Sequence, residues 1–109
     1  MLACVQIQFT IDDRARADAM VDDLLERRLV ACGQRMGPVL SRYWWKGAVE
    51  HAEEWMVVLK TRSDLVDRVF AAVLAAHPYE TPELISFDID GGAPDYLEWI
   101  GAVTSVPSP

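Results

Sequence analysis

The sequence predicts an α+β fold whose strands and helices follow the order βαββαβ, with one more helix at the C-terminal end. Two kinds of pattern support this prediction. Polar and apolar residues alternate in the first and last strand-like segments of the 109-residue chain, which is the period of a half-buried strand. Two other segments repeat apolar residues at spacings of three and four, which is the period of a helix with one buried face.

The first strand and the first helix are predicted for residues 4–11 and about 14–28. The strand residues expected to face the core are Val5, Ile7, Phe9 and Ile11. Asp12 and Asp13 follow the strand, and their side-chain oxygens can accept hydrogen bonds from the free amides at a helix start. These two residues therefore mark the boundary between the two elements.

A long hairpin is predicted in the middle of the chain. Residues 29–36 form a strand that Gly37-Pro38 ends, because proline cannot donate a hydrogen bond inside a ladder. Residues 39–45 continue as an extended segment that ends in a turn. The third strand spans residues 54–61, which contain an uninterrupted apolar run.

The second half of the chain repeats the pattern of a helix followed by a strand. Ser63 is expected to cap a helix that stops before Pro78, since the residue before a proline is disfavoured in the helical region. In residues 84–90 we expect Ile85, Phe87 and Ile89 to face the core and Ser86, Asp88 and Asp90 to face solvent. Asp95 and Glu98 have the spacing of a capping box and open the final helix.

This order of elements is the split βαβ or ferredoxin-like plan, in which two helices cover one face of an antiparallel sheet. The other face then lacks helices, and we expect its apolar side chains to form an interface with another protein chain. Residues 1–105 are predicted to form a single domain, and residues 106–109 a frayed tail.

Charge and composition exclude several classes of protein. A net charge of −7 argues against binding to nucleic acids or anionic membranes, because both require a basic surface. No apolar run reaches the roughly 18 residues of a membrane-spanning helix. Cys4 and Cys32 are expected to be reduced core thiols. No export signal precedes Leu2-Ala3-Cys4, so we expect a cytoplasmic protein without membrane insertion.

Two segments contain the strongest candidates for a binding site. Residues 43–47, Tyr-Trp-Trp-Lys-Gly, could stack on a flat ligand or pack at a subunit interface, and the alternation of side chains along a strand favours the interface. Residues 77–83, His-Pro-Tyr-Glu-Thr-Pro-Glu, hold a histidine, a phenol and two carboxylates between two prolines. This segment either binds a metal, donates protons or holds a polar ligand, or it is a structural loop in which His77 bonds the backbone.

Two further groups carry weaker signals. Residues 50–54, Glu-His-Ala-Glu-Glu, offer ligands for a divalent ion but lack the paired spacing of a metal site, so we predict a solvated hairpin tip. Lys60 and Thr61 could meet an anionic group, although a lysine at a strand end is usually only solvated. Motifs of nucleophilic or phosphate-binding enzymes are missing from the sequence, so we predict a non-enzymatic protein that requires no cofactor.

Five segments share one order along the chain with a known family: Leu29-Val30-Ala31-Cys32, Tyr43-x-Trp45-x-Gly47, Lys60-Thr61, His77-Pro78-Tyr79-Glu80-Thr81-Pro82-Glu83 and Tyr96-Leu97-x-Trp99-Ile100. Together they resemble the CutA family of divalent-cation tolerance proteins. The resemblance implies a homotrimer of ferredoxin-like subunits with a PII-like architecture, and an association with copper and other divalent ions. It also implies a ligand-binding cleft between subunits. The residues that correspond to this cleft are Trp45, Lys60, His77, Tyr79 and Glu80.

The chain departs from the family pattern at positions tied to copper. Phe9 and Ala76 stand where copper-binding members have a cysteine and a second histidine. Because a thiolate favours copper(I), we expect at most weak metal binding, through His77 and nearby carboxylates. The alternative function is a PII-like sensor that holds a small anionic metabolite or nucleotide in the intersubunit cleft, with Lys60 as the charge contact.

Overall fold

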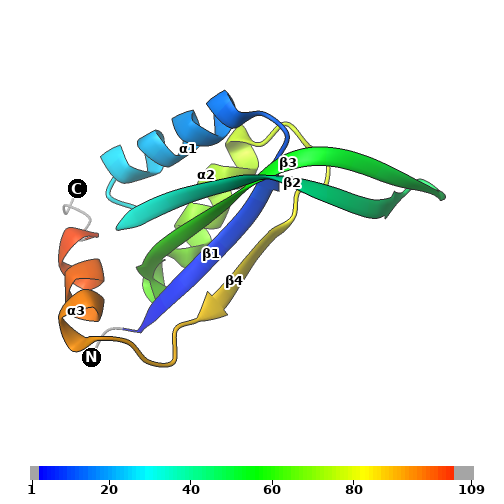
Figure 1. Cartoon of the computed structure of the whole chain (residues 1–109). Helices are drawn as coiled ribbons and strands as arrows, with labels where there is room; N and C mark the ends of the chain where they lie inside the picture. The colour runs from blue at the N-terminus through cyan, green and yellow to red at the C-terminus, as the bar shows by residue number, and fades with distance from the viewer. Residues whose placement is uncertain (1–2, 105–109) are drawn as a thin grey trace.

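A computed structural model describes residues 3–104, which form a four-stranded antiparallel sheet, two helices on one of its faces and a third helix at one end (Figure 1). The strands are β1 (Cys4–Ile11), β2 (Cys32–Trp45), β3 (Ala48–Arg62) and β4 (Leu84–Asp88), in the order β2-β3-β1-β4. The helices are α1 (Arg14–Glu26), α2 (Val66–Ala76) and α3 (Pro94–Val103), with a 3₁₀ turn η1 (Ser63–Leu65) before α2. The predicted ferredoxin-like α+β fold is confirmed, while the predicted tail at 106–109 lies outside the described residues.

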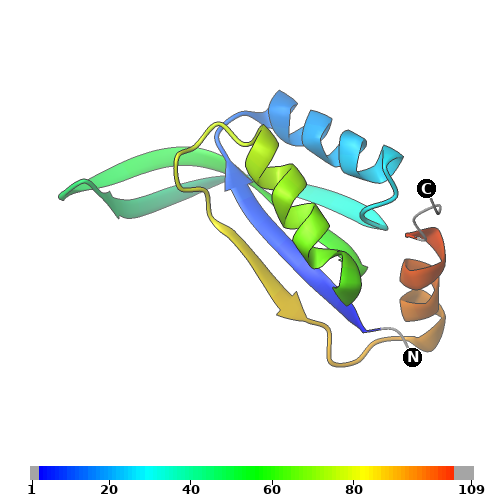
Figure 2. The same ribbon diagram turned by 180° about the vertical axis from the view of Figure 1, so that it is seen from behind.

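The hydrophobic core lies between the sheet and the two helices α1 and α2, which cover the same face (Figure 2). The largest cluster of buried side chains comprises Val5, Ile7, Phe9, Ile11, Ala17, Met20, Leu24, Leu29, Val30, Val57, Leu59, Val69 and Val73. The central strand β1 contributes every second residue from Val5 to Ile11. The predicted alternation in β1 is therefore confirmed.

The sequence placed Ile85 and Phe87 of β4 on the wrong face. Ile89, just after the strand, packs against a buried cluster as predicted. Ile85 and Phe87 are 41% and 47% exposed, and they pair with Gln8 and Gln6, which alternate with the core residues of β1. Leu84 is the β4 residue that packs against the core. Strict alternation separates a strand into two faces without showing which face the helices cover. The apolar set of β4 thus lies on the helix-free face of the sheet.

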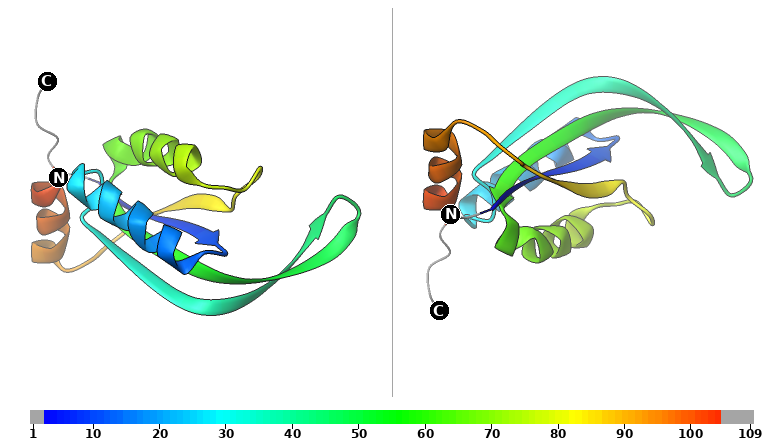
Figure 3. Two further views of the ribbon diagram at one scale, coloured as in Figure 1. Left: turned by 90° about the horizontal axis from the view of Figure 1, so that it is seen from above. Right: turned by 90° about the horizontal axis from the view of Figure 1, so that it is seen from below.

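The hairpin of β2 and β3 is longer and more continuous than predicted. Gly37-Pro38 does not end β2, because the pairing shifts there: Met36 pairs with Met56 and Val39 with Glu54. This bulge removes the proline from the ladder, where its missing N–H would leave a hydrogen bond unmade. The pairing then continues to the turn at the tip, and the hairpin curves away from the rest of the sheet (Figure 3).

The helix starts were predicted with mixed success. Asp13 caps α1 as expected, since its side chain accepts a hydrogen bond from the backbone N–H of Arg16 at 3.0 Å. Ser63 does not cap α2, because it begins the 3₁₀ turn η1 instead. The predicted capping box of α3 is also wrong: Pro94 takes the first helical position, and Asp95 lies inside the first turn. Proline is favoured there because its ring already fixes the helical φ angle.

Cys4 and Cys32 form no disulfide with each other, and residues of α3 contact both of them. Cys4 is buried in a small cluster with Ala31 and Ile100, as predicted for a core thiol. Cys32 is only half-buried, and its Sγ atom lies 3.7 Å from the Tyr96 hydroxyl. The prediction of a core thiol is therefore confirmed for Cys4 and wrong for Cys32.

Candidate functional site

The segment of residues 77–83 passes the end of β1 on its way from α2 to β4 (Figure 1). His77 directly follows α2 and is only 8% exposed. Its Nε2 lies 2.7 Å from the carbonyl oxygen of Thr10, and its Nδ1 accepts a hydrogen bond from the backbone N–H of Tyr79 at 3.2 Å. These partners assign the proton to Nε2. The geometry is that of the structural alternative, in which His77 bonds the backbone.

Aromatic packing adds to this anchor. The rings of His77 and Tyr79 meet edge to face with centroids 4.6 Å apart, and Phe9 packs in the same manner on His77 at 5.9 Å. Phe9 is fully buried, so the position where copper-binding members have a cysteine belongs to the core here. Such edge-to-face pairs contribute about 0.5–1.5 kcal/mol beyond the burial of area.

Tyr79 joins this segment to β3 through Glu54. The Tyr79 hydroxyl donates a hydrogen bond to Glu54 Oε2 at 2.9 Å, and Glu54 is only 5% exposed. Its burial follows from the pairing, because β1 ends opposite Trp55 and leaves Glu54 beside segment 77–83. Glu54 was predicted to belong to a solvated hairpin tip, which is wrong. The exposed members of that group are Glu50, His51 and Glu53.

The surroundings of Tyr79 raise the pKa of its hydroxyl well above the ordinary value of a tyrosine. Burial is the largest cause, followed by the hydrogen bond to Glu54 and the negative charge of that carboxylate. Asp12 and Tyr43 add smaller contributions in the same direction. All these effects stabilise the neutral phenol.

We expect the free energy of unfolding to fall as the pH rises above about 10, where tyrosine ionises in an unfolded chain. In that range the unfolded chain loses the Tyr79 proton and the folded chain keeps it, so increasing pH favours unfolding. Urea titrations between pH 8 and 11 should show a smaller decline for Tyr79→Phe than for the wild type. Tyr43→Phe serves as the control. Equal declines for Tyr79→Phe and the wild type would contradict this assignment.

The end of the hairpin reaches the same region through Lys46. Its Nζ lies 4.0 Å from Glu80 Oε2 and 5.5 Å from the centre of the Trp45 ring. Lys46 and Glu80 are both 73% exposed, and ion pairs of this kind contribute at most about 1 kcal/mol. Lys46 is therefore a common neighbour of Trp45 and Glu80 at the surface near Tyr79.

Lys60, by contrast, lies apart from the other predicted site residues within one chain. It follows Glu54 by six residues along β3, which is about 20 Å at the ordinary rise of a strand. Its Nζ donates a hydrogen bond to Gln34 Oε1 at 2.9 Å. The adjacent Thr61 is buried and donates to the Leu29 carbonyl oxygen at 2.6 Å, which is a structural role. A cleft that contains both Lys60 and His77 would therefore need a second subunit.

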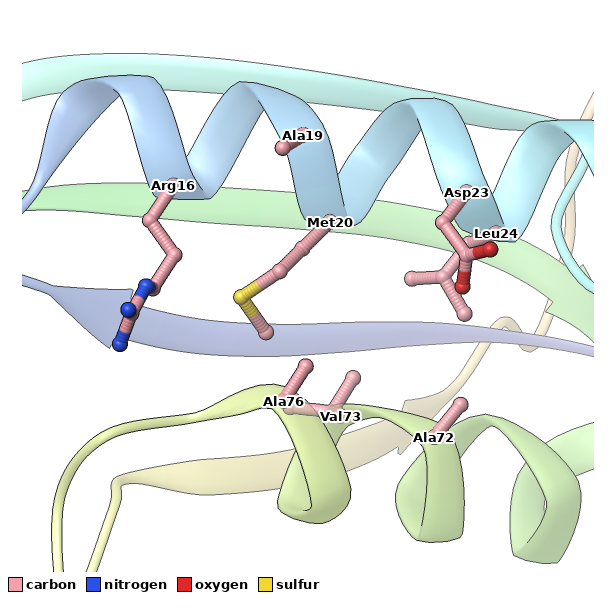
Figure 4. A pocket seen from close by; sticks show the side chains of 8 residues that line it. All are labelled: Arg16, Ala19, Met20, Asp23, Leu24, Ala72, Val73 and Ala76. Carbon is pink, nitrogen blue, oxygen red and sulfur yellow. The ribbon is translucent and has the colours of Figure 1, made fainter.

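No metal cluster marks the predicted site in the described part of the chain, and the best-formed cavity lies elsewhere. A cavity of about 330 Å³ lies between α1 and α2, where Met20, Leu24 and Val73 face it (Figure 4). Its lining includes none of the predicted site residues. Within residues 3–104, no three His, Cys, Asp or Glu side chains are grouped so that they could hold a metal ion.

The similarity to known proteins extends over almost the whole chain. The family model described as CutA1 divalent ion tolerance protein matches residues 3–103. The chain belongs to this family. Among relatives, it is 36% identical to the divalent-cation tolerance protein CutA of Pyrococcus horikoshii over 91 residues, which cover 84% of this chain and 88% of the relative. It is 39% identical to a CutA homolog of Danio rerio, but the matched region is 74% of this chain and 55% of that longer protein.

Solved structures of the CutA family share the fold. The CutA1 structure from Ehrlichia chaffeensis superimposes with a TM-score of 0.92 at 27% identity, covering 97% of this chain and 99% of that one. The structure of the periplasmic divalent cation tolerance protein CutA from Archaeoglobus fulgidus has a TM-score of 0.90 at 32% identity, covering 94% and 99%. The family assigned from sequence motifs is thus confirmed.

Proposed function

We propose that the protein is a homotrimer that contributes to tolerance of divalent cations, copper among them, by weak binding and not by catalysis. Membership of the CutA1 family over residues 3–103 is the observation that carries this proposal. The expected cleft of Trp45, Lys60, His77, Tyr79 and Glu80 is part of it. Because Lys60 lies apart from the other four within one chain, the complete site would form only between subunits.

Exposed apolar side chains on the helix-free face of the sheet support the trimer. They are Met36 (47% exposed), Ile85 (41%) and Phe87 (47%), on the two edge strands β2 and β4. Large apolar patches are uncommon on monomeric soluble proteins and usually mark interfaces. A trimer would bury this face and complete the small core of a 109-residue chain.

Metal binding is expected to be weak, because His77 is already engaged. A metal ion must bind a ring nitrogen that lacks a proton, and here Nδ1 accepts the Tyr79 N–H. Binding through His77 therefore costs that hydrogen bond or the one to Thr10. The nearby carboxylates are Glu54, which accepts the hydrogen bond of Tyr79, and Glu80, which lies beside Lys46. The buried Phe9 leaves no thiolate in the site.

Replacing His77 by asparagine should weaken the binding of Cu²⁺ and Zn²⁺ about tenfold or more. Even the loss of a residue that only orients a metal ligand usually lowers the affinity about 10- to 100-fold, and the loss of the ligand itself should cost at least as much. Isothermal titration calorimetry of chelator-treated protein measures the effect. His51→Asn is the matched control, since His51 is the other histidine of the chain and is exposed on the hairpin. If His77→Asn binds copper as tightly as the wild type, His77 is not a metal ligand.

The same proposal places the protein in the cytoplasm. No helix within residues 3–104 is long and apolar enough to cross a membrane. The relatives differ in location, since one from Oryza sativa is named chloroplastic and the Archaeoglobus fulgidus structure is titled periplasmic. Cell fractionation of the producing organism with an antibody to the protein would test this part directly.

A further inference from the structure

The cavity between α1 and α2 has the size of a small ligand pocket. Its volume of about 330 Å³ lies at the lower end of the usual range of about 300–1,000 Å³. Protein interiors are closely packed, so an opening of this size between two core helices has a local cause. Ala19 of α1 and Ala72 and Ala76 of α2 line it, and these short side chains leave the space between the helices unfilled.

The floor of this cavity is apolar. Met20, Leu24 and Val73 face it from the two helices, and all three side chains are buried (Figure 4). A methionine adapts its flexible side chain to different apolar partners. The floor therefore suits an alkyl chain. Because α1 and α2 lie on the face away from the one that the proposed trimer would bury, the cavity would stay open in that assembly.

The two ends of the cavity differ in charge. Arg16 lines one end and Asp23 the other, two helical turns or about 10 Å apart along α1. Asp23 already accepts a hydrogen bond from Arg27 at 3.2 Å. Arg16 is exposed and forms no ion pair within residues 3–104, and its side chain extends from α1 toward α2 (Figure 4). The cavity therefore favours a negative group at Arg16 and disfavours one at Asp23.

We propose that this cavity binds a small amphiphilic carboxylate, that is, a straight alkyl chain with a carboxylate at one end. The chain lies on the apolar floor, and the carboxylate meets the Arg16 guanidinium, which can donate two parallel hydrogen bonds to it. The reverse orientation would place the carboxylate beside Asp23, where like charges repel. The cavity shares no residue with the candidate site, so the proposal does not depend on cation binding.

Sodium octanoate and 1-octanol test the charge contact, because they have similar chains and differ in the charge of the head group. NMR titration of the Met20 methyl signal gives both dissociation constants. We expect the wild type to prefer octanoate, and Arg16→Gln to lower this preference by up to about fivefold, as for an exposed ion pair. Arg14→Gln is the matched control, since Arg14 is exposed on the same helix and does not line the cavity. An unchanged preference in Arg16→Gln, or equal losses in both variants, would overturn the proposal.

Ala72→Leu tests the apolar part of the site, because a leucine fills the cavity from α2. We expect octanoate to bind at least about tenfold more weakly, since the leucine occupies the place of the chain. Ala19→Leu fills the cavity from α1 and decides the question if Ala72→Leu does not fold. Ala15→Leu is the matched control, because Ala15 is exposed one turn before Ala19 and does not line the cavity. Full binding in the folded variants that fill the cavity would overturn the proposal.

Sedimentation velocity of the wild type and of a folded variant that fills the cavity distinguishes a ligand site from a contact between copies of the chain. We expect the same assembly state for both, since the proposed site needs no second chain. A smaller assembly for the variant would show that a second copy covers the cavity, and would overturn the proposal. A Met20 signal that does not respond to octanoate in the wild type would also overturn it.

Discussion

Replacing Phe9 by alanine should lower the free energy of unfolding by about 3–5 kcal/mol, the usual cost of removing a fully buried phenylalanine. Phe9 is 0% exposed and lies on the central strand β1, where its backbone pairs with Val57 on one side and Leu84 on the other. Its ring also packs on His77. The cavity left by alanine would therefore loosen both the core and the anchor of segment 77–83.

Urea denaturation at one fixed protein concentration would measure this effect, because the stability of an oligomer depends on concentration. Phe9→Leu provides the comparison, since it keeps most of the buried volume and should cost clearly less. A loss below about 1 kcal/mol for Phe9→Ala would show that the core closes around the smaller side chain, contrary to the close packing described here.

Replacing Phe87 by glutamate should convert the proposed trimer into monomers. Phe87 lies on the helix-free face of β4 with 47% of its side chain exposed, so the change costs little within one chain. In a trimer that buries this face, each subunit would instead bury an unpaired carboxylate, which costs several kcal/mol. Because three copies are affected at once, dissociation should be complete at micromolar concentrations.

Sedimentation velocity distinguishes the two assembly states. Ser86→Glu is the matched control. Ser86 is the adjacent residue of β4 and pairs with Ile7, so its side chain lies on the face opposite to that of Phe87. It introduces the same charge on the same strand, and it should leave the trimer intact. A Phe87→Glu protein that stays trimeric would place the interface elsewhere on the chain.

The fold could be predicted because local patterns in this chain agree with its tertiary structure. The alternation of β1 and the Asp13 cap of α1 both depend on near neighbours in the sequence. The orientation of β4 could not be predicted in the same way. Ile85 and Phe87 lie on the helix-free face, and their alternation does not show which face of the sheet the helices cover. The continuous β2 was missed because a bulge beside Pro38 depends on the partner strand.

The sequence identified the segments that form the candidate site, but not the contact between Tyr79 and Glu54 that joins them. His77, Tyr79 and Glu80 are adjacent in sequence, so a motif can identify them together. Glu54 was missed because its burial follows from the point where β1 ends, opposite Trp55, which no local pattern shows. One signal in the sequence could have indicated that Glu54 is buried. It directly precedes the apolar run of residues 55–59, and a residue next to a buried strand segment is itself often buried.

Native mass spectrometry of the chelator-treated protein, before and after a small excess of Cu²⁺ or Zn²⁺, tests the central claim most directly. We predict a mass of three times the 12.2 kDa of one chain, with weakly bound metal that a mild increase in collision energy removes. A trimer that takes up no metal would contradict the proposed metal binding, while the proposed trimeric assembly would still hold. A monomer under the same conditions would contradict the account of the helix-free face, and with it the site between subunits.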